Sequence, residues 1–236
     1  MTFSTTARTL ASSLILALLV AAAPARADDR ADAVALLGKA DTALKSFLNE
    51  PRWSALRNML GGARAVAIFP ELKRGGFIVA GEGGAGVFLI RHGAGWSDPL
   101  VIDLSTTSVG FQAGAEVSSG VLAIMADTGP KRLLDGAMNV GGTASVALAD
   151  LGVGAAAQGA GSTGIDALMV THGSGLFAGG ALGATSTTVN QKRNFALYGE
   201  GTDLKAVAER PQGRLPEAAA LRETLAGATA KAWRGD

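Results

Sequence analysis

Cysteine is absent from all 236 residues of the chain. The protein therefore has neither a disulfide nor a lipobox for acylation, so an oxidising compartment would be tolerated but not exploited. Histidine is nearly as scarce, because only His92 and His172 occur, each within a glycine-rich turn sequence. We expect both to be exposed loop residues, and the sequence predicts no metal site and no histidine-based catalysis.

The chain also has few aromatic residues and almost no net charge. One tyrosine and three tryptophans are too few for the two aromatic girdles of a transmembrane β-barrel. Loss of the first 27 residues would remove Arg8 and Arg26 from the 21 basic residues, leaving 19 against 20 acidic residues. A chain so close to neutrality has no global field that would attract nucleic acid, so any attraction to anions must be local.

The N-terminal 27 residues have the three parts of a secretory signal peptide. Arg8 is the only charge ahead of the apolar run LILALLVAAA, and Ala25-Arg26-Ala27 places small residues at the −3 and −1 positions of a cleavage site. The apolar run is shorter than the roughly 20 residues that a membrane-spanning helix needs. We therefore expect cleavage near Ala27 and a periplasmic or secreted mature chain beginning at Asp28.

The remaining residues, 28–236, are enough for one domain with its own core. Apolar residues recur at helical spacing near both ends, in 28–62 and 203–236. Between them, residues 63–202 contain short β-favouring runs separated by glycine, proline, serine and aspartate, with one helical interruption at PKRLLDGA and a final expected strand at NFALYGEG. Strands of about ten residues predict an α+β fold: a glycine-rich antiparallel β barrel or sandwich flanked by N- and C-terminal helices.

The role of the 33 glycines separates several classes of function. Residues 81–86 match the G-x-G-x-x-G pattern of dinucleotide-binding folds, but those folds need a helix after the third glycine, and VFLIRHGAG predicts a strand and a turn. We interpret the glycines of GGFIVAGEG, VGFQAGAEV and GLFAGGALG as positions of tight curvature or close packing within strands. No Walker lysine, nucleophile elbow or H-E-x-x-H motif occurs. The sequence predicts no cofactor and no enzymatic activity.

Six motifs occur in an order that resembles the SYLF domain family, across about residues 33–202. They are ARAVAIFPELKRGGFIVAGEGGAGVFL, GWSDP, VGFQAGAE, ASVALADLGVGA, GLFAGGALGAT and NFALYGEG. That family binds lipids and is related to the actin-binding region of yeast cortical-patch proteins. The resemblance implies an α+β domain with affinity for phosphoinositides or other anionic lipids, and actin binding in some eukaryotic members. The signal peptide separates this chain from those eukaryotic members and indicates a bacterial secreted member. For such a member the resemblance implies contact with anionic lipid in general, but not a particular lipid ligand.

Three basic doublets are the candidate lipid-binding residues. They are Lys73 and Arg74, Lys131 and Arg132, and Lys192 and Arg193. Each is expected in a turn or at the end of an element, beside apolar residues. If the three turns converge, six positive charges face one surface, each contributing about 1 kcal/mol near an anionic membrane. If they are scattered, they are ordinary solvated charges.

The first expected helix also carries Lys39 and Lys45 opposite its apolar stripe, and this stripe is more typical of packing on a core than of a membrane interface. The expected function is peripheral binding of anionic phospholipid headgroups. A periplasmic structural or protein-binding scaffold without a lipid role stays open as the alternative. A hydrolase is the third candidate, since serine, aspartate and histidine occur but in no interpretable arrangement.

Overall fold

The computed structural model describes residues 23–76, 79–135, 153–158, 167–210 and 213–234. Its helices are α2 (Ala23–Asn49), η1 (Pro51–Trp53), α3 (Ser54–Gly62), α4 (Gly129–Leu134), α5 (Gln191–Tyr198), α6 (Leu204–Ala208), η3 (Pro216–Ala218) and α7 (Ala219–Arg234). Its strands are β1 (Ala65–Gly76), β2 (Val79–His92), β3 (Gly95–Trp96), β4 (Leu100–Ile124), β5 (Val153–Gln158) and β6 (Ala167–Val189). All strand pairings are antiparallel.

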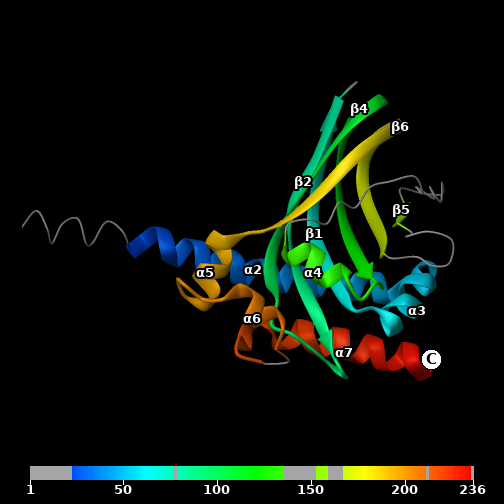
Figure 1. The fold of residues 1–236 in the computed structure, drawn as a ribbon. Helices are drawn as coiled ribbons and strands as arrows, with labels where there is room; N and C mark the ends of the chain where they lie inside the picture. Colours follow the sequence, from blue (N-terminus) through cyan, green and yellow to red (C-terminus); the bar gives the residue numbers. More distant parts are fainter. Residues whose placement is uncertain (1–22, 77–78, 136–152, 159–166, 211–212, 235–236) are drawn as a thin grey trace, which may run out of the picture.

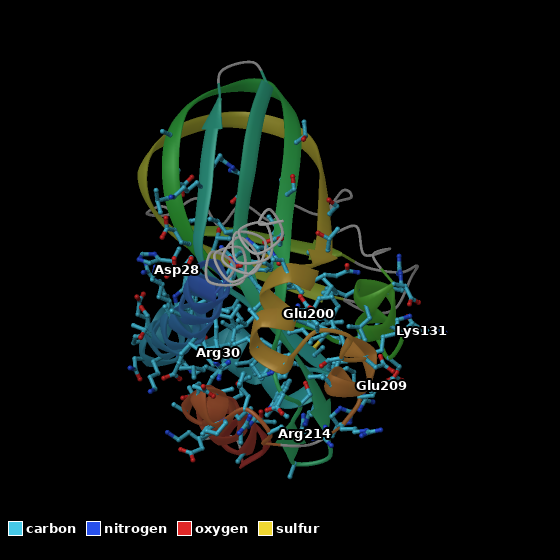
Figure 2. The ribbon with its side chains drawn as sticks, turned by 90° about the vertical axis from the view of Figure 1, so that its left-hand side faces the viewer. Asp28, Arg30, Lys131, Glu200, Glu209 and Arg214 are labelled. Carbon is cyan, nitrogen blue, oxygen red and sulfur yellow. The ribbon has the colours of Figure 1, made fainter. Side chains whose placement is uncertain are left out.

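The long strand β4 organises the sheet. Residues 100–109 pair with β2, whereas residues 114–124 pair with β1. Because β1 and β2 pair with each other, β4 has to turn across the far end of that pair. β6 follows the outer side of β4 through the whole turn, pairing with residues 102–124. Figure 2 shows β4 and β6 arching over the top of the sheet.

Because β4 and β6 both turn, each half of these strands crosses one open antiparallel sheet separately, and each crossing is called a pass here. Within the described residues the order of passes is the second half of β6, the first half of β4, β2, β1, the second half of β4, the first half of β6, and β5. Gly114 lies where β4 turns and has φ 139°, a backbone conformation that favours glycine. This glycine allows the strand to change direction without ending.

Apolar side chains gather on both faces of the lower half of the sheet. On one face, β-strand residues such as Val66 and Ile68 pack with α2, α3 and α7. On the other face, Phe69 and Phe88 belong to a second cluster, to which α4 contributes Leu133. Figure 1 shows α2 and α7 across the base of the sheet and α4 beside it, while the upper parts of β2, β4 and β6 extend beyond the helices. Thus α2 and α4 lie against opposite faces.

The expected terminal helices are confirmed, and so is the α+β class with an antiparallel sheet. The buried residues of α2 recur at helical spacing, as expected for a helix lying on a core: Ala33, Leu37, Ala40 and Leu44. Pro51 and Pro216 stand at the starts of η1 and η3, each followed directly by a longer helix. Proline is well tolerated there because the first helical N–H groups lack partners inside the helix.

The expected strand lengths were wrong. GFIVAGE and AGVFLIR belong largely to the single strand β2, and three further expected runs join into the 25 residues of β4. The glycines between the runs of β2, and the serines and threonines between the runs of β4, continue the strands instead of ending them. The sequence ASVALADLGVG lies mostly outside the described residues. The helical interruption at PKRLLDGA is confirmed as α4.

The strand expected at NFALYGEG was also wrong, because α5 spans Gln191–Tyr198. Asn190 caps this helix, since its side-chain oxygen accepts a hydrogen bond from the Arg193 backbone N–H at 3.0 Å. Asn194, one turn later, is buried and bonds to the backbone of β4. Capping and tertiary hydrogen bonds thus override the strand-like pattern.

The packing interpretation of the glycines holds for only part of β2: within GGFIVAGEG, Gly83 is closely packed but Gly75 and Gly81 have open space, and the tightest positions, Gly84 and Gly86, follow that run. A Cβ on Gly86 would collide with the ring of Phe69 and approach the Ile68 carbonyl oxygen to 2.7 Å. A Cβ on Gly84 would collide with the Glu71 carbonyl oxygen. Both positions lie inside one continuous strand, without the helix that a dinucleotide site would require.

Candidate functional site

The first basic doublet lies within β1, not in a turn. Neighbouring strand residues point to opposite faces, and Lys73 lies on the side of α2, where it lines a groove with residues of that helix. Arg74 points to the other side and donates a hydrogen bond to the Glu82 carboxylate at 2.8 Å. Only one member of this doublet therefore faces α2.

The second doublet, Lys131 and Arg132, lies on α4, against the face of the sheet opposite to α2. Both side chains are exposed. Lys131 lines a separate cavity of about 340 Å³ together with Arg64 and Lys205. In Figure 2, Lys131 and Arg30 of α2 lie on opposite sides of α5.

The third doublet occupies the first turn of α5, next to the start of α2. Lys192 forms an ion pair with Asp29 at 3.0 Å. Arg193 is half-buried, and its side chain lines the same groove as Lys73. The structure therefore brings Lys73 and Arg193 together, but it does not gather all three doublets on one surface.

The groove that they share lies between α2 and the paired strands β1 and β2, and we call it the α2 groove. It has a volume of about 370 Å³. Its lining residues come from α2, β1, β2 and α5: Asp32, Ala35, Leu36, Lys39, Pro70, Glu71, Lys73, Gly83, Gly84, Ala85 and Arg193. Three cations and two carboxylates thus surround a partly apolar space.

The charges of the α2 groove are only partly neutralised internally. Lys73 pairs with Glu71 at 2.9 Å. This hydrogen bond, together with the positive charges of Lys73 and Lys39, holds the pKa of the Glu71 carboxyl below its usual value. Within the described part of the chain, the side chains of Lys39 and Arg193 form no hydrogen bond or ion pair with another residue. Two cations therefore remain available to a ligand.

Lys39 was recognised in the sequence as a residue of the polar side of a helix, but not as a neighbour of Lys73. Asp32, Leu36 and Lys39 are spaced along one face of α2, and this spacing was the available sequence signal. The sequence does not show where that face of the helix lies relative to β1.

Neither histidine is the exposed loop residue that was expected. His92 is half-buried at the end of β2, and its Nε2 lies 2.9 Å from the Ala208 carbonyl oxygen. His172 is half-buried within β6, with its Nδ1 3.1 Å from a guanidinium nitrogen of Arg52. Long strands that run past the glycine-rich sequences account for this difference. No group of three metal-ligating side chains is found in the described ranges.

None of the helices described is both long and apolar enough to cross a membrane.

Comparison with known proteins gives a family match. The model of the Ysc84 family, described as "Las17-binding protein actin regulator", matches residues 105–228. This confirms the family resemblance seen in the sequence for that part of the chain. The family is associated with actin regulation and lipid binding.

The curated relatives share 28–30% identity with this chain over the aligned residues, and they are longer than it. SH3 domain-containing YSC84-like protein 1 of Xenopus laevis is 28% identical over 175 residues, covering 71% of this chain and 52% of the relative. The human protein of the same name is 28% identical, with 60% and 42% covered, and an SH3 domain-containing protein of Schizosaccharomyces pombe is 30% identical, with 60% and 34% covered. The chain thus spans between about a third and a half of these relatives. No solved structure gave a significant match.

Proposed function

Because this chain belongs to the Ysc84 family, we propose that it is a non-enzymatic domain that binds anionic phospholipid headgroups peripherally. The observation that carries the proposal is the set of cations on the side of α2, where Lys39, Lys73 and Arg193 line one groove. Each basic residue near an anionic membrane surface contributes about 1 kcal/mol, so a local set of this kind can act despite near-neutral net charge.

Salt dependence and lipid charge test this function. The purified protein should sediment with vesicles that contain phosphatidic acid, and binding should weaken as salt rises, because screening shortens the reach of surface charges. Vesicles of phosphatidylcholine alone are the control. Protein that stays in the supernatant with anionic vesicles at low salt would rule out the lipid function, and equal sedimentation with neutral vesicles would rule out the electrostatic mechanism.

The alternative is a structural or protein-binding scaffold without a lipid role. The position of Lys131 and Arg132 favours it, because they lie across the sheet from the α2 groove and so cannot join one six-residue basic surface with the other doublets. The family description, which names a protein partner, is consistent with this alternative. The same sedimentation assay separates the two functions, since a scaffold ignores lipid charge.

We further propose that the chain is exported and processed after Ala27, as its N-terminal sequence suggests. Cleavage there would remove only the first five residues of α2, and among its remaining residues, 28–49, the first buried position is Ala33. Processing is therefore compatible with the packing of the helix. Mass spectrometry of cell fractions should find a mature N-terminus at Asp28, and an intact Met1 in the cytoplasmic fraction would contradict export.

A further inference from the structure

The α2 groove combines features that suit one kind of ligand. Its cations come from three elements that are distant in the sequence, α2, β1 and α5, so their convergence depends on the fold. Its volume of about 370 Å³ falls in the range of roughly 300–1,000 Å³ that is usual for small-molecule sites. Ala35, Leu36 and Pro70 add apolar surface beside the charges. A ligand with an anionic group attached to a less polar body matches this lining.

The wall of the groove formed by β2 consists of Gly83, Gly84 and Ala85, which carry at most a methyl group. Gly84 borders the groove through its backbone, because a Cβ there would point to the other face of the sheet, toward Leu72 and the Glu71 carbonyl oxygen. At Gly83, a Cβ would lie 3.2 Å from the Leu104 carbonyl oxygen. The wall thus projects no more than a methyl group into the groove, and the space in front of it is left for a ligand.

The cations are held in different ways. The backbone of Arg193 is fixed by the Asn190 cap of α5, so its guanidinium projects from a rigid first turn. Lys73 is positioned by Glu71 at 2.9 Å, and Lys39 by its place on α2. Guanidinium groups recognise phosphate oxygens in a two-pronged geometry, and lysines supply additional point charges. Asp32 and Glu71 offset part of this charge, which leaves the groove a net positive charge.

From this arrangement we propose that the α2 groove binds the phosphate monoester of a lipid headgroup, with Lys39, Lys73 and Arg193 as its ligands. The proposal rests on the lipid-binding function proposed above and gives it a defined site. Arg74, Lys131, Arg132 and Lys192 then have no direct part in phosphate binding. A free phosphate ester offers the same chemistry, so the experiment must separate the two sources.

The decisive comparison uses two triple variants with equal loss of charge. The groove variant carries Lys39→Gln, Lys73→Gln and Arg193→Gln. The control variant carries Lys131→Gln, Arg132→Gln and Lys231→Gln, three exposed positions on α4 and α7. Exposed charges contribute little to stability, and the half-buried Arg193 forms no side-chain hydrogen bond or ion pair within the described residues, so both variants should keep the far-ultraviolet circular dichroism spectrum and melting transition of the parent protein.

Two probes are titrated into each protein: sn-glycerol 3-phosphate by calorimetry, and phosphatidylcholine vesicles with or without phosphatidic acid by sedimentation. We expect the parent and the control variant to bind both phosphate-bearing probes, and the groove variant to lose about tenfold or more in affinity for both, because each lost contact is charge-assisted. Phosphatidylcholine alone should bind none of the proteins.

Each other outcome contradicts a defined part of the proposal. An equal loss in both triple variants would mean that charge acts without a site, and a groove variant that binds vesicles like the parent would move the site elsewhere; in both cases the proposed lipid function survives and the groove does not. Binding of sn-glycerol 3-phosphate in the groove without vesicle binding would overturn the lipid source and the proposed function together.

Discussion

The side-chain amide of Asn194 pairs with the backbone of Val101 through two hydrogen bonds. The Val101 N–H donates to Asn194 Oδ1 at 2.8 Å, and Asn194 Nδ2 donates to the Val101 carbonyl oxygen, also at 2.8 Å. The last residue pair of the ladder between β4 and β6 is Ile102 with Val189, so Val101 lies one residue beyond the end of that ladder. Asn194 is fully buried. Its amide therefore continues the hydrogen bonding of the sheet after β6 has given way to α5.

Replacing Asn194 by aspartate should destabilise the fold. One carboxylate oxygen would face the carbonyl oxygens of Val101 and Asn190, which now accept hydrogen bonds from Nδ2. Each carbonyl keeps a backbone donor, the N–H of Asn190 or of Asn194, so the cost comes from repulsion between facing oxygens and from the buried charge. We expect a loss of about 2–5 kcal/mol in the free energy of unfolding, measured by urea denaturation. Asn58→Asp, at an exposed position of α3, is the matched control and should change stability by less than about 0.5 kcal/mol.

The buried carboxylate of Asp98, just before β4, binds to two groups near the C-terminal helix. It accepts hydrogen bonds from the Arg222 guanidinium of α7 and, at 2.9 Å, from the Arg214 backbone N–H. Arg222→Met should lower the free energy of unfolding by about 3–5 kcal/mol, because it leaves a buried charge without its cation. Lys205→Met breaks the exposed pair with Asp135 and should cost far less. Equal losses in thermal or urea denaturation would contradict the role of burial.

Two glycines of β2 should respond differently to the same added methyl group. Gly86→Ala places a Cβ against Phe69 and Ile68, and we expect a loss of about 1–3 kcal/mol from overpacking. Gly81→Ala meets no atom within 4 Å and should be neutral or stabilising by about 0.5 kcal/mol, because alanine restricts the unfolded chain. Urea denaturation of both variants measures the difference, and a tolerant Gly86 would refute close packing as its cause.

Tyr198 is the only tyrosine in the sequence, so tyrosinate absorbance reports on this residue alone. Burial, assisted by the negative charge of Asp98 and opposed by the positive charge of Arg222, raises its pKa above the usual value. Its hydroxyl also donates to the Pro99 carbonyl oxygen at 2.5 Å. Alkaline titration of the folded protein should therefore show no ionisation near pH 10, and tyrosinate should appear only with unfolding.

The raised pKa of Tyr198 also sets a direction for stability. Above about pH 10 the unfolded chain loses this proton while the folded chain keeps it, so stability falls as pH rises, by about 1.4 kcal/mol per pH unit from this group. Below that pH the contribution is fully present. Tyr198→Phe should make the decline with pH shallower in urea denaturation, and an unchanged slope would contradict the assignment.

The sequence by itself determined the properties that depend on local pattern. Helical spacing from Ala33 to Leu44, and prolines at helix starts, were enough to predict the terminal helices. β-favouring composition was enough to predict an antiparallel sheet between them. Order of motifs was enough to identify the family later matched over residues 105–228. These features depend on neighbouring residues, and so they can be inferred without tertiary contacts.

The lengths of the strands, and the position where the last strand gives way to a helix, could not be predicted without tertiary structure. Glycines that are typical of turns instead lie inside β2, because the Phe69 ring occupies the space a side chain would need at Gly86. The strand expected at NFALYGEG is α5, because Asn194 finds its partners on β4, 93 residues away along the chain. Neither partner is visible from local sequence.

The composition of the candidate site was also decided by the fold. The pairing of β1 shifts register between Phe69 and Leu72, and Leu72 consequently joins the same core cluster as Phe69. Because side chains alternate along a strand, this shift turns Lys73 toward α2 and Arg74 toward Glu82. Sequence placed the two residues together as one basic doublet. Strand alternation puts them on opposite faces, and the irregularity in β1 decides which of them can meet Arg193.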